Sequence, residues 1–153
     1  DYSTRVVLVG SGDPSLKSPN LDAMAKTTAA ALLAKQTTAA RVYVDDDVFP
    51  TPTLAYGWKE SYVPDSVAPV RALVRDQRND PDTSAEAARY FRDRLKAYGV
   101  TEAGYYGRAN ASSTSTVIAS TQGSTLSTIV GTMLPMMSPF LTRRPSASAS
   151  FGA

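Results

Sequence analysis

The fold of this chain is decided by residues 5–47, which read RVVLVGSGDPSLKSPNLDAMAKTTAAALLAKQTTAARVYVDDD. A short β-branched run at 5–9 stops at a glycine-rich turn, which predicts a buried strand that ends in a tight turn. From Leu21 the apolar positions recur every three or four residues, and Asn20 can cap the first turn, so we expect a helix of about four turns. Residues 41–44 read as a second strand. The unit is therefore β-α-β, and such a crossover normally places its two strands parallel.

The remaining sequence extends this unit into a small α/β domain. Ser66 can cap a helix over 66–79, and a second helix over 83–98 begins with a capping box at Thr83 and ends at Gly99. Residues 100–108 and 115–119 are typical of strands. We therefore predict a single α/β domain over residues 1–109, with a mixed sheet and about three helices packed on it. A Ser/Thr/Ala-rich extension over 110–153 follows.

Composition excludes several classes of function. The 153 residues include 16 Lys and Arg and 14 Asp and Glu, for a net charge of +2, so no general attraction to nucleic acid is expected. There is no cysteine and no histidine, which removes disulfides, thiol nucleophiles, the commonest general base and the commonest zinc ligand. We predict no catalytic residue, no cofactor and no metal. The chain begins at Asp1 without a signal or transit peptide, which favours a processed mature product of unknown localisation.

Chemistry, if present, is expected at the opening glycine turn. Gly10, Ser11 and Gly12 follow a strand and precede a helix, which is half of a dinucleotide fingerprint, and backbone amides at such a turn can hold an anion. Asp45 ends the second strand, where a ribose-binding carboxylate would lie. Three successive carboxylates, residues 45–47, could hold a hard cation, but adjacent strand residues point to opposite faces. A solvated turn is therefore the favoured interpretation of the three.

The same opening resembles the start of another family. Residues 7–14, the helix that follows and residues 42–45 are similar to the first β-α-β unit of the tetrapyrrole methylases, whose first strand runs into a glycine- and proline-rich turn. This resemblance implies binding of S-adenosylmethionine at the turn.

Two segments are candidates for protein binding. Residues 49–69 are punctuated by prolines and contain the only tryptophan, so they form either a binding arm or a loop in which Trp58 covers the core. Residues 126–141 are apolar and methionine-rich, but they are interrupted by prolines and shorter than the roughly 20 residues of a membrane-spanning helix. We predict a docking segment there, or one that closes the domain's own core, and a flexible tail after it. The predicted partner-binding residues are Tyr56, Trp58, Tyr62, Met133, Met136, Met137, Phe140, Arg143 and Arg144.

These observations favour a non-catalytic structural, linker or assembly subunit of a large multiprotein complex. Its partners would be other protein subunits, bound through the aromatic loop and the extended C-terminal segment. The alternative is a small nucleotide- or S-adenosylmethionine-binding enzyme that uses the turn of Gly10, Ser11 and Gly12. An enzyme is the less favoured of the two hypotheses.

Overall fold

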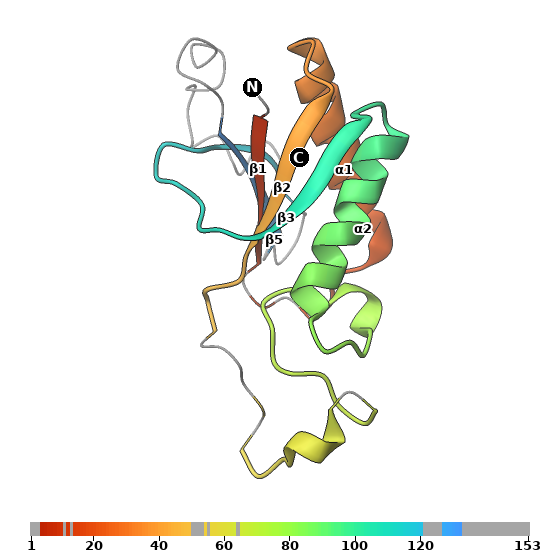
Figure 1. Ribbon diagram of the computed structural model, residues 1–153, viewed down its shortest axis with the longest axis vertical. Coiled ribbons are helices and arrows are strands. Elements are labelled where there is room, and N and C mark those ends of the chain that lie inside the picture. The colour runs from red at the N-terminus through yellow and green to blue at the C-terminus, as the bar shows by residue number, and fades with distance from the viewer. Residues whose placement is uncertain are drawn as a thin grey trace.

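The protein is an α/β domain with one five-stranded sheet and two α-helices among the residues that the structure describes (Figure 1). The computed structural model describes residues 4–10, 12, 14–49, 54, 56–63, 65–120 and 127–132. Its elements are β1 (Thr4–Gly10), α1 (Ser18–Ala34), β2 (Ala39–Asp45), η1 (Glu60–Tyr62), η2 (Arg75–Gln77), α2 (Thr83–Ala97), β3 (Glu102–Arg108), β4 (Thr116–Ser120) and β5 (Ser127–Thr132).

The sheet has the strand order β3-β2-β1-β5-β4. Strands β1, β2 and β3 are parallel, whereas β5 is antiparallel to β1 and β4 is antiparallel to β5. The α/β class and the β-α-β opening are thus confirmed. Strands β4 and β5 both lie in the predicted extension over residues 110–153. Strand β5 also lies within the predicted docking segment, 126–141, and its backbone pairs with β1, with Val130 opposite Val7.

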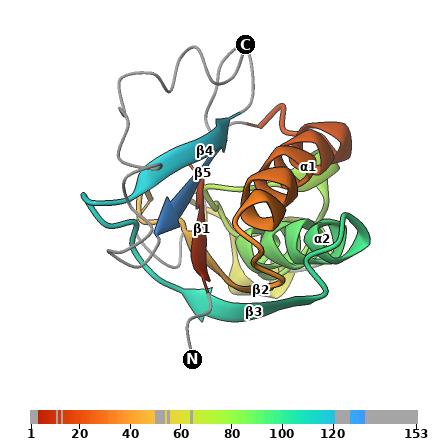
Figure 2. The same cartoon turned by 90° about the horizontal axis from the view of Figure 1, so that it is seen from above.

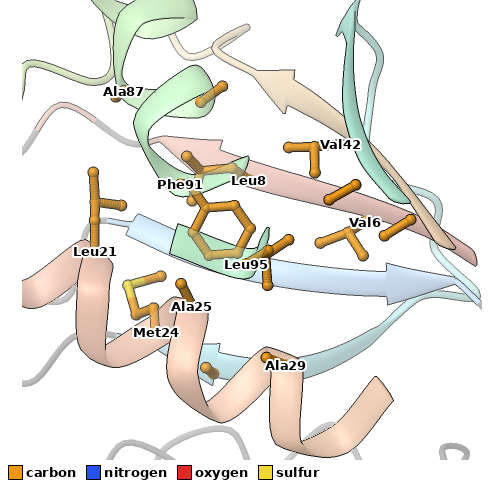
Figure 3. Close-up of a cluster of buried hydrophobic side chains, with 14 of the residues drawn as sticks. Val6, Leu8, Leu21, Met24, Ala25, Ala29, Val42, Ala87, Phe91 and Leu95 are labelled. Carbon is orange, nitrogen blue, oxygen red and sulfur yellow. The ribbon is translucent and has the colours of Figure 1, made fainter. Parts of the chain in front are cut away.

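Both helices pack on the same face of the sheet, as Figure 2 shows. Because side chains alternate along a strand, every second residue of β1 and β2 points at the helices. The core between the layers joins Val6, Leu8 and Val42 of the sheet to Leu21 and Met24 of α1 and to Phe91 and Leu95 of α2, all at most 2% exposed (Figure 3). Within the described part of the chain, neither helix has the length and apolarity that crossing a bilayer requires.

The helix ends follow local chemistry. Helix α1 begins at Ser18 with Lys17 as its N-cap, so the predicted cap at Asn20 is wrong by three residues; Asn20 lies in the first turn, and its side chain accepts from the Lys17 amide (3.0 Å). Helix α2 is capped by Asp82, whose Oδ1 accepts from the Ala85 amide (3.1 Å), so the predicted cap at Thr83 is wrong by one residue. Gly99 has φ +108°, the left-handed conformation that ends a helix.

The predicted helix over 66–79 does not form, so the prediction of about three helices is wrong. Of that stretch only η2 is helical, and its Asp76 has φ 54°, which an α-helix does not allow. Tertiary contacts explain the difference: Leu73 is fully buried, and a Cβ on Gly10 would lie 2.5 Å from its Cγ. Packing on the first strand therefore overrides the helical pattern of the sequence.

Candidate functional site

The candidate site is the edge of the sheet at the carboxyl ends of the three parallel strands. Ligands of α/β proteins usually bind outside this edge, because the loops that follow the strands meet there. The edge contains Gly10, Asp45 and Arg108, the last residues of β1, β2 and β3.

The glycine turn after β1 is closely packed by the protein itself. The Gly12 amide donates to the Ala72 carbonyl oxygen (3.0 Å), so this amide is already engaged. Gly12 has φ +96°, and a Cβ there would lie 2.9 Å from the Phe49 ring. Ser11 lies outside the described residues. The assignment of a ligand to Gly10, Ser11, Gly12 and Asp45 stays a prediction, and a ligand would have to displace residues 72–73 or Phe49 to reach the amides.

The three successive aspartates at the end of β2 lie in different surroundings. Asp45 Oδ2 accepts a hydrogen bond from the Ala111 amide (2.8 Å), which connects the end of β2 to the loop between β3 and β4. Asp46 is 3% exposed and pairs with Arg108, whereas Asp47 is exposed. The alternation along a strand thus separates the carboxylates, as the sequence predicts. No group of three His, Cys, Asp or Glu side chains that could hold a metal ion occurs among the described residues.

A bulge in β3 brings Arg108 to Asp46. Val42 lies opposite Tyr105 and Val44 opposite Arg108, so two steps along β2 match three steps along β3. The additional residue turns Arg108 to the same face as Tyr105, which is the helix-bearing face. Gly107 has φ +100° within this irregular stretch, a conformation that glycine adopts without steric cost.

Arg108 joins two aspartates that come from different elements. Its Nε and one Nη donate to Asp46 Oδ1 (3.0 Å) and Oδ2 (2.9 Å), and the guanidinium also donates to Asp82 Oδ1 (2.7 Å) and Oδ2 (2.9 Å). Arg71 lies near both carboxylates, with its closest nitrogens at 3.8 Å from Asp46 and 4.0 Å from Asp82. We call these four residues, Asp46, Arg71, Asp82 and Arg108, the edge ion network.

Charge balance in the edge ion network keeps both carboxylates ionised. Burial is the largest single influence and raises the pKa of Asp46, but hydrogen bonds from Arg108 and Ser84 and the charges of Arg108 and Arg71 together outweigh it, so the pKa of Asp46 falls below its ordinary value. The same balance lowers the pKa of Asp82, which also accepts from the Ala85 amide. The two carboxylates in turn raise the pKa of Arg108. Such groups hold the loops together but do not exchange protons near neutral pH.

A second polar cluster joins the start of α1 to α2. Ser18 donates from its amide to Asp76 Oδ1 (2.8 Å) and from its hydroxyl to Oδ2, and it accepts from Arg75 Nη1 (2.6 Å). Arg75 is 6% exposed, pairs with Glu86 of α2 and lies 4.1 Å from the centre of the Tyr90 ring. The hydrogen bonds from Ser18 lower the pKa of Asp76, so this carboxylate is a weak base.

The predicted aromatic arm is exposed. The exposed fractions of Tyr56, Trp58 and Tyr62 are 105%, 48% and 41%, and η1 lies away from the sheet and the helices (Figure 1). The 48% exposure of Trp58 favours the arm over a loop that covers the core. Partner binding by these three side chains stays a prediction. The other predicted partner-binding residues lie outside the described residues: Met133, Met136, Met137, Phe140, Arg143 and Arg144.

Sequence reasoning misses most of the edge ion network. It places Asp46 in a solvated turn, although a position two residues after the buried Val44 would continue the core-facing side of β2. It places Arg71 and Arg108 in a helix and a strand without a role at a site. A glycine shortly before a strand's end, here Gly107, is the one signal that a bulge could redirect the residue that follows.

Comparison with known proteins gives a family match. The model of the D-Ala-D-Ala carboxypeptidase 3 (S13) family matches residues 1–81, which is more than half of the 153 residues. The matched part contains β1, α1, β2 and the loop through η2, and it ends one residue before the cap of α2. No curated protein and no solved structure shows significant similarity to the chain.

Proposed function

This chain belongs to the D-Ala-D-Ala carboxypeptidase 3 (S13) family, and we propose that the protein acts in removing the C-terminal D-alanine from peptides that end in D-Ala-D-Ala. The observation that supports the proposal is the family match over residues 1–81. The reaction adds water across the amide bond between the two D-alanines, which releases free D-alanine and leaves a peptide shortened by one residue.

The family match overturns the function predicted from the sequence. A peptidase family is not compatible with a non-catalytic structural, linker or assembly subunit, so that prediction is wrong. The match to the carboxypeptidase family also replaces the alternative hypothesis of a nucleotide- or S-adenosylmethionine-binding enzyme, which the resemblance to the tetrapyrrole methylases supported. That alternative depends on the glycine turn as a ligand site, whereas the structure packs the turn against residues 72–73.

The nucleophile of this reaction is not apparent among the described residues. Penicillin-binding proteins and β-lactamases use serine in an S-x-x-K motif with S-D-N and K-T-G, and no serine of this sequence has lysine three residues later. Ser18 does donate to a carboxylate, but Asp76 has a lowered pKa and Ser18 also accepts from Arg75. A nucleophilic serine needs an adjacent base that can take its proton near neutral pH. We therefore assign Ser18 a structural role.

We propose that the described α/β domain contributes to the reaction by binding and positioning. The edge ion network and the cluster around Ser18 hold loops and helices with ionised groups that are already paired. Such a frame is rigid, and a rigid frame is what the positioning of a peptide requires.

Release of D-alanine by the natively purified protein tests the proposal. The substrates are an N-acylated peptide ending in D-Ala-D-Ala and its L-Ala-L-Ala counterpart, and the alanine released from each is measured by chromatography, which detects both enantiomers. We expect release from the first peptide only. Absence of D-alanine release, or equal cleavage of the two peptides, would contradict the proposed function.

A variant tests the role of Ser18 separately. Ser18→Ala should keep D-alanine release, because the hydroxyl serves the junction of α1 with η2 and not the chemistry. The change should lower the melting temperature, since Asp76 and Arg75 each lose a hydrogen-bond partner. If release stopped while the circular dichroism spectrum and the melting curve remained those of a folded protein, Ser18 would be the nucleophile and our reasoning would fail.

A further inference from the structure

A strap of chain, residues 72–77, covers the carboxyl end of β1. It lies beside residues 12–18, the segment that joins β1 to α1, and we call it the edge strap. Its first residue, Ala72, accepts a hydrogen bond from the Gly12 amide (3.0 Å). Ligands of open α/β sheets bind outside this edge, so the edge strap lies between such a ligand and the Gly12 amide.

The far end of the edge strap is attached at three places. The Asp76 amide donates to the Leu16 carbonyl oxygen (2.9 Å), and the Asp76 carboxylate accepts from the amide (2.8 Å) and the hydroxyl of Ser18. Arg75 donates to Ser18 Oγ (2.6 Å) and pairs with Glu86 of α2. The strap is therefore closed onto both helices through Asp76 and its neighbour.

The backbone of the edge strap is strained at the place where these contacts are made. Asp76 has φ 54° and Gln77 has φ 55°, and they are two of the three described residues other than glycine that have a positive φ. The left-handed conformation is unfavourable for a residue with a Cβ, so two such residues in succession oppose the closed position. The contacts of Asp76 hold the strap in place against this strain, and the strain is relieved when the strap leaves.

We infer that the edge strap is a latch, which closes over the carboxyl end of β1 and opens as a unit while the sheet stays folded. Burial of Leu73 beside Gly10 opposes opening, whereas the strain at Asp76 and Gln77 favours it, so the open form is a minor state of the folded protein. Opening frees the Gly12 amide. A ligand that needs this amide binds the open form alone, and its apparent affinity is reduced by the open fraction. The latch does not depend on the proposed peptidase activity.

Amide hydrogen exchange, measured residue by residue by NMR on the folded protein, tests for the latch. We expect the Gly12 and Asp76 amides to be equally protected, because one opening breaks both of their hydrogen bonds. Both should be at least about tenfold less protected than the amides of Val6 and Val42, which pair with each other in the middle of the sheet. A smaller difference from the sheet, or a more than tenfold difference between Gly12 and Asp76, would overturn the inference.

Two glycine substitutions distinguish strain in the latch from a general effect of glycine. Gln77→Gly removes the steric cost of the positive φ, which exists only in the closed form, and it should slow exchange of the Gly12 and Asp76 amides about threefold. Gln36→Gly is the matched control, because Gln36 has φ 56° just beyond the end of α1 that lies farthest from Ser18. It should leave both rates unchanged. Equal effects of the two substitutions, or no slowing by Gln77→Gly, would contradict the latch.

A substitution at the far end of the edge strap tests whether the strap opens as a unit. Ser18→Ala removes a hydrogen bond to Asp76 and should speed exchange of the Gly12 amide, at the other end of the strap, about fivefold or more. Asp22→Asn is the control, since it weakens a different contact of α1 with α2, the ion pair to Arg94, and it should leave Gly12 exchange unchanged. If Ser18→Ala did not change Gly12 exchange, or changed it no more than Asp22→Asn does, the two ends would open independently and the inference would fail.

Discussion

Replacing Asp46 by asparagine should destabilise the domain by about 2–3 kcal/mol at neutral pH. Asp46 is 3% exposed and accepts charge-assisted hydrogen bonds of 3.0 Å and 2.9 Å from Arg108. A hydrogen bond to a charged group contributes roughly 1.5–3 kcal/mol, and asparagine would keep one acceptor but turn an NH₂ group toward the guanidinium. The loss of stability should be smaller than for a fully buried ion pair, because Arg108 is 38% exposed and keeps its ion pair with Asp82 in the variant.

The effect of Asp46→Asn should depend on pH. The pKa of Asp46 is lower in the folded protein than in the unfolded chain, where it is about 3.9, so its pairing stabilises the fold fully above roughly pH 5. That contribution is lost as the pH falls through the lower pKa of the folded state. The amide that replaces the carboxylate in the variant does not titrate, so the difference in free energy of unfolding between wild type and variant should shrink on acidification.

Urea unfolding at pH 7 and pH 3 measures both effects. Asp47→Asn is the matched control, because it makes the same chemical change at the next residue, which is exposed, and it should alter stability by less than about 0.5 kcal/mol. Equal losses for Asp46→Asn and Asp47→Asn at pH 7, or a loss for Asp46→Asn that is as large at pH 3 as at pH 7, would refute our account of the edge ion network.

Three other substitutions test separate parts of the fold by the same unfolding assay. Gly10→Ala should cost about 3 kcal/mol, because its Cβ would lie 2.5 Å from Leu73 Cγ and 2.9 Å from a backbone oxygen; a cost below about 1 kcal/mol would show that the loop yields easily. Gly107→Ala meets no atom within 4 Å, so only its φ of +100° opposes it, and we expect a loss of about 1–2 kcal/mol. Thr28→Val should be neutral or stabilising by up to about 1 kcal/mol, because the Thr28 hydroxyl is buried without a hydrogen-bond partner among the described residues.

The opening of the chain is predictable because its signals are local. The β-branched run, the glycine turn and the spacing from Leu21 each report on neighbours within a few residues, and the structure has the β-α-β unit that they indicate. Helix α2 is predictable for the same reason, although its cap is Asp82. These elements depend little on where distant residues fold.

The third helix and the edge ion network are not predictable in this way. Leu73 has a helical spacing in the sequence, but it packs where Gly10 has no Cβ, and Gly10 lies more than 60 residues earlier in the chain. Arg108 meets Asp46 because a bulge shifts the register, and sequence alternation cannot show which strand carries an additional residue. The glycine turn has two physical uses, an anion site or a tight packing contact, and only the contacts of Gly12 distinguish them.

The paired carboxylates of this domain favour the proposed role in binding and positioning over a role as a general base. A general base for amide hydrolysis needs a pKa near the working pH, whereas Asp46, Asp76 and Asp82 all have pKa values that their partners lower. The arginine and serine partners of these carboxylates join loops to helices. The contacts that make the carboxylates poor bases therefore also hold the loops and helices together. The most exposed aromatic side chains lie away from these carboxylates: Tyr56, Trp58 and Tyr62 on the arm and Tyr106 on β3. Within the described residues, these exposed side chains are separate from the ion pairs that hold the fold, which agrees with the proposed contribution by binding and positioning.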